Sequence, residues 1–483
     1  MKRTLISLLV LLLLAGVLLV PANANSAQSK WEGVDQSGAI IVDGNSPIVV
    51  EREVLTFDLQ QFPQSYYREV EDFLAYTGKV TAEYTFYNPS DMTVTATLLF
   101  PFGCEAQYGI FYDESTRLDH VDAEKYDILI DGEPIEKTLR HSLSFWGSQF
   151  DLETDLGLLS DSFVQDDFYS PDLTVTKYTF RVSGVDTEKY RAADVAFDVP
   201  QGMGSYRIYF PDQEGAHTQK NKEMRIGTSA RKNGREFDLY VFGTPFSAMP
   251  EWKVYENGGV EDKEEIAGSV QLVGTATMTF KEFALSNWSE DSGVSQVDWY
   301  NATVAEVTDE RNHYDRYPIA EAGRHASGFR GSLMRWYQYQ IELAPGERAV
   351  NAVTAPLYPA IDLGYEPDVY TYTYLLSPAR TWSSFGALEI VINTPYFVTE
   401  SSLEGFEKTE TGYILKRDGL PDGELVFTLS ESENPVKPVK KVTDFIPIEL
   451  IISFSLIGLG ALLLITGGVV VTVLIVRSKR KKK

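Results

Sequence analysis

Short segments in which apolar and polar residues alternate recur along most of this chain. The clearest are residues 80–86 and 94–100, where every second residue is apolar, with Asn88-Pro89-Ser90-Asp91 between them. Alternation with period two is the pattern of a strand that has one buried face, and the Asn-Pro-Ser-Asp sequence favours a turn. These residues therefore predict two strands joined as a β-hairpin.

The same pattern predicts strands elsewhere, at residues 126–130, 178–182, 206–210, 237–242, 270–280, 336–343, 370–376, 388–392 and 425–429. Helical periodicity is clear only between Asp291 and Asn312, behind a Ser292 that we expect to cap the helix, and a shorter helix is expected at residues 63–73. Many short strands between turn residues favour a mainly β fold with two antiparallel sandwich-like halves and one or two short helices.

Polar stretches suggest where the chain divides. Residues 211–236 are rich in Gly, Asn, Lys and Glu and lack periodicity. We therefore predict an N-terminal β-sandwich domain at residues 25–215 and a C-terminal β-rich domain at 216–430. Residues 431–449, with Pro435 and Pro438, are expected to form a short stalk.

The two ends of the chain predict export and a membrane anchor. Residues 1–24 combine a basic start, an apolar centre and a small-residue cleavage site, as in a secretory signal peptide, although an uncleaved anchor is the alternative. Residues 450–476 contain no charge and are long enough to span a bilayer as a helix. The basic residues 477–483 that follow predict a cytoplasmic tail and an external body.

Charge and cysteine content limit the possible partners and the cellular location of the protein. Between the basic ends, the body has 35 basic and 69 acidic residues, a net charge of −34, so it repels phosphate backbones and nucleic acid is excluded as a partner. Cys104 is the only cysteine, so no intrachain disulfide can form. For a large exported body this favours a bacterial or archaeal cell surface, and we expect a bacterial cell membrane.

Four segments occur in a recognisable order: residues 48–55, 82–91, 99–103 and 130–135, with a second half at residues 343–347, 372–376 and Trp382. Their order resembles exported bacterial β-domains classed as domains of unknown function. The resemblance spans most of residues 48–395 and rests on strand and turn signatures. It implies a paired β-sandwich outside the cell, and it carries over no catalytic residue.

An acidic stretch without Lys or Arg follows His141. Its candidate ligands for calcium are Asp151, Glu153, Asp155, Asp166 and Asp167. Calcium is abundant outside cells and takes six to eight oxygen ligands, which such a loop could supply. No Asp-x-Asp-x-Asp-Gly loop is present, so a solvated acidic loop is the favoured interpretation.

Other chemical patterns are weak. Ser229-x-x-Lys232 matches a serine acyl-enzyme motif, but its flanks favour a turn and no partner motif is present. Trp146, Trp252 and Trp382 could stack on sugars, although most aromatic residues in strands belong to the core. No catalytic residue or cofactor is predicted.

Three functions remain open from the sequence. The favoured one is a non-enzymatic, single-pass surface protein whose acidic β-rich ectodomain binds or supports an envelope protein or glycan, with the lipid bilayer as its other partner. The second is an envelope hydrolase that acts on glycan or peptide through paired carboxylates. The third is a calcium-stabilised adhesive module.

Overall fold

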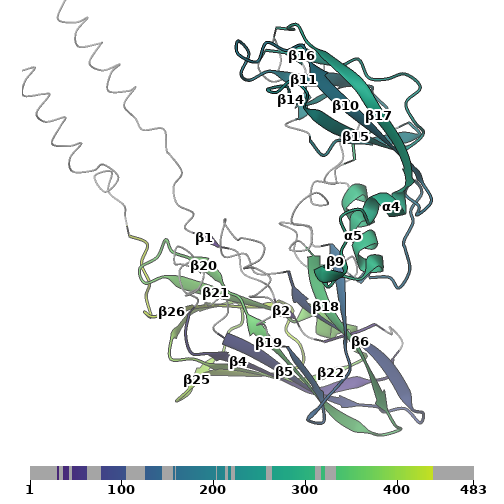
Figure 1. Ribbon diagram of the computed structural model, residues 1–483. Helices are drawn as coiled ribbons and strands as arrows, with labels where there is room; N and C mark the ends of the chain where they lie inside the picture. Colours follow the sequence, from purple (N-terminus) through teal and green to yellow (C-terminus); the bar gives the residue numbers. More distant parts are fainter. Residues whose placement is uncertain are drawn as a thin grey trace, which may run out of the picture.

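The computed structural model describes residues 30–31, 36–37, 39–42, 46–62, 78–104, 126–143, 156–157, 159–202, 204–212, 216–218, 224–256, 264–309, 317–320 and 333–438. These residues are mainly β, which confirms the predicted fold class at that level. Figure 1 shows two bodies, one built from the middle of the sequence and one from both of its ends. The predicted signal peptide, membrane helix and tail, and the helix predicted at residues 63–73, lie outside the described residues.

The host domain comprises the described residues of 30–143 and 333–438. Its largest sheet has eight strands in the order β24 (Glu407–Lys408), β25 (Gly412–Asp418), β22 (Phe385–Asn393), β4 (Val49–Leu59), β5 (Gly78–Tyr87), β19 (Arg348–Leu357), β7 (Asp127–Ile130) and β8 (Glu133–Pro134). Strands from opposite ends of the sequence are neighbours here: β4 pairs with β22 in parallel, and β5 pairs with β19 antiparallel.

Two smaller sheets complete the host domain. One has the order β1 (Lys30–Trp31), β20 (Ala360–Asp362), β21 (Val369–Leu375), β26 (Leu425–Ser430) and β23 (Phe397–Ser401), with β2 (Gln36–Ser37) also paired to β21. The other has the order β3 (Ile40–Ile41), β6 (Val94–Gly103), β18 (Leu333–Leu343) and β9 (Thr138–Leu143). All three sheets contribute side chains to one hydrophobic core, including Phe57, Phe427 and Ile341.

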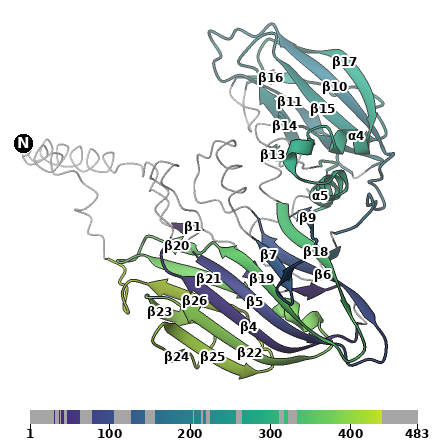
Figure 2. The same cartoon turned by 60° about the horizontal axis from the view of Figure 1, so that its bottom comes forward.

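The inserted domain comprises the described residues between 159 and 320. One of its sheets has the order β12 (Tyr206–Tyr209), β15 (Glu236–Gly243), β10 (Thr174–Ser183) and β17 (Ser269–Thr279). The other has the order β13 (Ala216–Thr218), β14 (Met224–Ser229), β11 (Asp194–Val199) and β16 (Lys253–Tyr255). The apolar residues of the two sheets share a second core, and Figures 1 and 2 show the two sheets next to each other.

This arrangement replaces the predicted boundary near residue 215. The chain leaves the host domain after β9 and returns at β18, and these two strands pair with each other, with Leu143 directly opposite Leu333. The inserted domain therefore begins and ends at one place on the host sheet. A polar stretch cannot reveal this, because the division depends on which distant strands pair and not on local composition.

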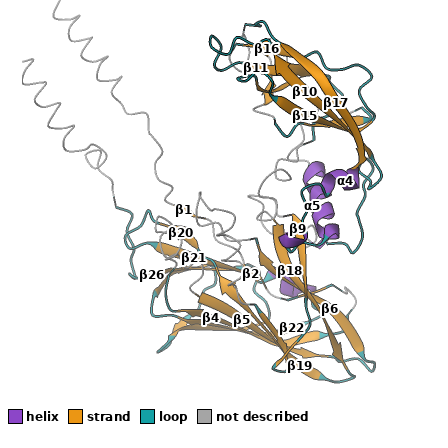
Figure 3. Cartoon of the chain, in the orientation of Figure 1, coloured by secondary structure: helices purple, strands orange, loops and turns teal. Residues whose placement is uncertain are grey.

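Helix α5 (Gln296–Thr308) connects the two domains, next to the shorter helix α4 (Phe280–Ala284) (Figure 3). One side of α5, with Tyr300, Val304 and Val307, packs on the inserted domain. Its other side, with Trp299 and Ala302, packs with Leu143 and Leu333 of the host domain, among other residues. The helix predicted between residues 291 and 312 is confirmed, but its N-cap is Ser295 and not Ser292.

The strands predicted at residues 80–100 are present, but the hairpin is wrong. β5 and β6 lie in different sheets, so the turn between them is a corner. The side-chain amide of Asn88 donates hydrogen bonds to the carbonyl oxygens of Leu343 and Ala344, at 3.0 and 3.1 Å. These bonds tie this corner to the end of β18, just before β19 begins. Since β18 pairs with β6 and β19 pairs with β5, two consecutive strand pairs change sheet together.

Candidate functional site

A cavity of about 200 Å³ opens at one end of the six-stranded sheet of the host domain. Its lining comes from three separate segments of the chain: Phe62, the loop residues Tyr365, Glu366, Pro367 and Asp368 with Tyr370 of β21, and Glu431. We call this the aromatic–acidic pocket. Glu431 directly follows β26, which pairs with β21, so strand pairing brings Glu431 and Asp368 to the same end of the sheet.

Phe62 forms one wall of the pocket because of the parallel pairing of β4 with β22. Residues that follow two parallel strands emerge at the same edge of a sheet, and Phe62 follows β4 as Tyr396 follows β22. The two rings stack with their centroids 3.9 Å apart, and Phe62 stacks on Tyr370 at 3.8 Å with 7° between the ring planes. The side-chain amide of Gln60 also donates to the carbonyl of Asn393, at 3.3 Å. The two lining residues Phe62 and Tyr370 therefore belong to a preformed stack of three rings, in which Tyr396 lies behind Phe62.

Carboxylates form the other part of the lining. Burial raises the pKa of Asp368, and the negative charges of Glu431 and Asp362 raise it further. Burial also raises the pKa of the Tyr370 hydroxyl, with further contributions from Asp368 and Glu431. The pocket therefore has a concentrated negative potential, in which a proton or another cation is bound more favourably than in bulk water.

The residues that lead toward the predicted membrane helix border the pocket. The backbone N–H of Glu366 donates to the carbonyl of Val436 at 2.8 Å, and the N–H of Val436 donates back at 3.2 Å. This pairing places the ammonium of Lys437 over the ring of Tyr365, at 4.5 Å from its centroid. The same ammonium lies 3.9 Å from a carboxylate oxygen of Asp362.

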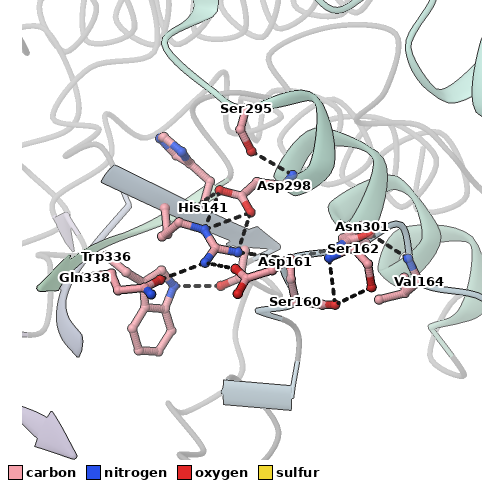
Figure 4. A network of polar contacts seen from close by, with 12 residues as sticks. His141, Ser160, Asp161, Ser162, Val164, Ser295, Asp298, Asn301, Trp336 and Gln338 are labelled. Carbon is pink, nitrogen blue, oxygen red and sulfur yellow. Dashed lines mark hydrogen bonds and ion pairs between the residues drawn. The ribbon is translucent and has the colours of Figure 1, made fainter. Parts of the chain in front are cut away.

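A second polar cluster fixes the inserted domain to the host sheet (Figure 4). Arg140 of β9 donates from Nε to both carboxylate oxygens of Asp298 on α5, each at 3.2 Å, and from a terminal nitrogen at 3.0 Å. Its other terminal nitrogen reaches Asp161 and Gln338, each at 2.8 Å. Burial alone lowers the pKa of Arg140, but hydrogen bonds and charge from Asp298 and Asp161 outweigh it and leave the pKa raised. The cluster is a structural joint, because its charges and hydrogen bonds satisfy one another.

A third polar cluster lies in the host core. The carboxylate of Glu53 on β4 is 1% exposed, and it accepts a long hydrogen bond of 3.5 Å from the Tyr374 hydroxyl. The Tyr374 hydroxyl lies 3.4 Å from that of Tyr84. Among the described residues, the second oxygen of Glu53 and both side-chain amide atoms of the fully buried Gln36 have no hydrogen-bond partner. Burial raises the pKa of Glu53 to about 7.

The residues predicted to hold calcium are only partly described. Asp151, Glu153 and Asp155 lie outside the described residues. One carboxylate oxygen of Asp166 accepts from the backbone N–H groups of Phe168 and Tyr169, so this side chain stabilises a local turn. Asp167 is exposed. Within the part of the chain that the structure describes, no three His, Cys, Asp or Glu side chains gather as a metal site. Calcium binding at residues 151–167 stays a prediction.

The other sequence candidates lie away from the pocket. Trp382 is 5% exposed and stacks on Phe86 in the host core, while Trp252 packs among Phe180, Phe197 and Phe237 in the inserted domain. The buried Trp382 therefore offers no surface for sugars, Trp252 is half-buried with its ring against three phenylalanines, and Trp146 lies outside the described residues. Ser229 ends strand β14, and Lys232 follows in the turn to β15. The helical context that the serine motif needs is therefore missing there.

No residue of the aromatic–acidic pocket is among the candidate site residues that the sequence predicts. No local pattern joins residue 62 to residues 365–370 and 431, because strand pairing alone brings them together. The only signal in the sequence was the placement of Phe62 and Tyr396 after strands that each end in a polar turn. That signal becomes informative only once β4 and β22 are known to be parallel neighbours.

The described chain contains no helix that is both long and apolar enough to cross a bilayer.

No family model matches the sequence, and no curated protein shows significant similarity to it. Among solved structures, the chain is similar to a crystal structure of a "putative nutrient binding protein" from Legionella pneumophila subsp. pneumophila strain Philadelphia 1. The two are 9% identical, with 83% of this chain and 72% of that chain covered and a TM-score of 0.32. A likeness this distant carries no argument about fold or function. The class is set by the chain itself: a mainly β protein in which one β domain is inserted into another.

Proposed function

We propose that this protein is an exported, single-pass membrane protein that binds a ligand in the aromatic–acidic pocket without catalysing a reaction. The observation that carries the proposal is the convergence of three aromatic rings, of Phe62, Tyr365 and Tyr370, with three carboxylates in one cavity. Concave sites with aromatic walls and a few polar groups are the usual form of small-ligand sites. The cavity, at about 200 Å³, is smaller than typical sites, so the ligand is small or enters by one end only.

The setting of the pocket supports a role near the membrane surface. Residues 1–24 and 450–483 support export and a single membrane span with the body outside, and both segments lie outside the described residues. Val436 pairs with the rim of the pocket, and residue 450 lies 14 positions further along the chain. At about 3.5 Å per extended residue, the rim lies within about 50 Å of the start of the span. The ligand would then be an envelope component, and the acidic body disfavours nucleic acid.

A ligand panel tests the proposal on the full chain in an uncharged detergent. Neutral sugars, amino sugars, short peptides and small amines are each added during thermal unfolding. A ligand at 100 times its Kd is expected to stabilise the folded protein by about 2.7 kcal/mol. The stabilisation should be lost with Phe62→Ala combined with Asp368→Asn, and retained with Glu407→Gln, an exposed change on β24 outside the pocket. A ligand that stabilises all variants equally would place binding elsewhere.

A second function, hydrolysis of an envelope glycan or peptide, is favoured by one observation. Asp368 and Glu431 line the same pocket, and the pKa of Asp368 is raised, as expected for a general acid beside a second carboxylate. Incubation of the full chain with envelope glycan and peptide fractions tests this alternative. Hydrolysis would release new reducing ends or amines, and the single changes Asp368→Asn and Glu431→Gln would each abolish the release. Binding with no turnover supports the non-enzymatic proposal.

A further inference from the structure

The charges of the aromatic–acidic pocket indicate what kind of ligand it takes. Three of its seven lining residues, Glu366, Asp368 and Glu431, are acidic, and no Lys or Arg is among the described lining residues. Burial and the neighbouring Glu431 and Asp362 already disfavour a negative charge on Asp368. An anionic ligand would add to this repulsion and a neutral one would leave it unchanged. A cation relieves it, so the electrostatic gain on binding is largest for a positively charged ligand.

The hydrogen-bonding capacity of the lining agrees with this choice. Ionised carboxylates only accept hydrogen bonds, and Pro367 has no N–H to offer. Tyr365 and Tyr370 supply the side-chain hydroxyl donors of the lining. A sugar presents hydroxyl groups that both donate and accept, so it would find many acceptors and few donors. An ammonium group has donors or polarised C–H groups only, which matches a lining rich in acceptors.

The aromatic residues supply the other half of a cation site. The face of an aromatic ring attracts a cation placed within about 6 Å of its centroid. Tyr365 already receives the ammonium of Lys437 in this way, at 4.5 Å, and Asp362 lies 3.9 Å from the same ammonium. The rim of the pocket thus holds an ammonium between a ring and a carboxylate. Deeper in the pocket, Tyr370 supplies a ring and Asp368 and Glu431 supply carboxylates, while Phe62 backs the Tyr370 ring by stacking on it.

From these contacts we infer that the aromatic–acidic pocket binds an alkylammonium group, either as a small organic cation or as the charged end of a larger envelope molecule. The inference rests on the proposed function, because it names the ligand class of that same pocket. A volume of about 200 Å³ suits one ammonium group with its neighbouring carbons. Lys437 occupies the rim, so its ammonium competes with the ligand for Tyr365.

Calorimetric titration of the full chain in an uncharged detergent tests the inference with three probes. Choline represents a quaternary ammonium, Nα-acetyl-lysine amide represents the primary ammonium of a peptide side chain, and 3,3-dimethylbutan-1-ol is the neutral isostere of choline. At least one of the two cations is expected to bind at least tenfold more tightly than the neutral alcohol. The tighter cation identifies the source, with choline pointing to a quaternary head group and the lysine amide to a peptide amine.

Variants then assign binding to the pocket. Asp368→Asn and Glu431→Gln should each weaken cation binding about tenfold, and Glu407→Gln should leave it unchanged. Lys437→Gln should tighten binding about threefold, because it removes a competing positive charge from Tyr365; weaker binding in this variant would contradict the inference.

Equal binding of choline and its neutral isostere, or no binding of either cation at 10 mM, would overturn the ammonium assignment. If the neutral probe alone binds and Phe62→Ala abolishes its binding, the proposed function stands and only the ligand class is wrong. If no ligand of any class depends on Phe62, the proposed function fails as well.

Discussion

Glu53 is a carboxyl group held inside the core of the host domain. It lies on β4 at 1% exposure, among the hydroxyl groups of Tyr84 and Tyr374, and one of its oxygens has no partner among the described residues. A charged carboxylate is unfavourable there, so burial raises its pKa from 4.5 to about 7. The native protein therefore binds this proton more tightly than the unfolded chain does. Glu53 makes the stability of the host domain depend on pH.

We predict that Glu53→Gln stabilises the protein in alkaline solution. In the wild type, the proton bound to Glu53 increases the free energy of unfolding. This contribution is fully present below pH 4.5 and is lost as pH rises through about 7. The full loss corresponds to about 3 kcal/mol at 1.36 kcal/mol per pKa unit. Glutamine keeps the shape and cannot ionise, so Glu53→Gln should be more stable than wild type at pH 8 and similar to it at pH 5. Urea unfolding across this range measures the difference.

Glu51 on the same strand supplies the control for that measurement. Its pKa is lowered, mainly by a hydrogen bond from Arg348, so Glu51→Gln should lower stability slightly near neutral pH. A wild-type stability that does not fall between pH 5 and pH 8 relative to Glu53→Gln would show that Glu53 is not buried as described.

Helix α5 is the element on which the relation between the two domains depends. Its residues from Asp298 to Val307 are all buried, because the inserted domain covers one side and the host sheet covers the other. Asp298 is 1% exposed and pairs with Arg140, whose side chain is 11% exposed. Removing one partner of a buried ion pair leaves the other charge without compensation, which is strongly destabilising.

Asp298→Asn is expected to destabilise the junction by about 3 kcal/mol. The matched control is Asp161→Asn, which removes the other acidic partner of Arg140 from a side chain that is 88% exposed. Because exposed pairs contribute little, this control should cost less than about 1 kcal/mol. Urea unfolding and limited proteolysis between the domains report the effect. An equal loss in the free energy of unfolding for Asp298→Asn and Asp161→Asn would contradict the role assigned to Asp298. The double change Arg140→Met with Asp298→Leu should recover only part of the loss, because it removes both buried charges but also removes the acceptor of the buried His141 backbone N–H, which donates to Asp298 at 3.0 Å.

Individual strands could be predicted from the sequence far better than the strands with which they pair. Alternation identified the strands at residues 80–86 and 94–100, because the period depends only on which face is buried. It could not show that these strands enter different sheets, since that depends on the bonds from Asn88 to Leu343 and Ala344, some 255 residues away. The aromatic–acidic pocket could not be predicted from the sequence for the same reason. Phe62, Asp368 and Glu431 are ordinary residues until strand pairing brings them together.

At the scale of the whole molecule, the inserted domain is joined to the host at one point. Leu143 and Leu333 are register partners in an antiparallel pair, so their Cα atoms lie about 5 Å apart. Domain insertion is tolerated where the ends of the inserted piece are this close. The three core-forming sheets of the host and the whole aromatic–acidic pocket come from residues outside the inserted segment.

We therefore predict that the host domain folds without residues 144–332. Joining residue 143 to residue 333 through Asn-Gly would close β9 and β18 as a hairpin. Leu143→Thr, Leu333→Thr and Arg140→Thr replace side chains that lose their cover from α5. Circular dichroism and cooperative unfolding should show a folded β protein that retains the pocket's ligand binding. An unfolded or aggregated product would show that the host core needs the inserted domain.

Photo-crosslinking in intact cells of the organism that makes this protein tests most directly whether the aromatic–acidic pocket is the ligand site. The full chain carries p-benzoylphenylalanine in place of Tyr365, or in place of Tyr87 on β5 outside the pocket, and mass spectrometry identifies the adducts. We predict an amine-bearing envelope adduct from position 365 that is absent from position 87 and is lost when Asp368→Asn is added. The same adducts from both positions, or none specific to position 365, would show that the aromatic–acidic pocket is not the ligand site.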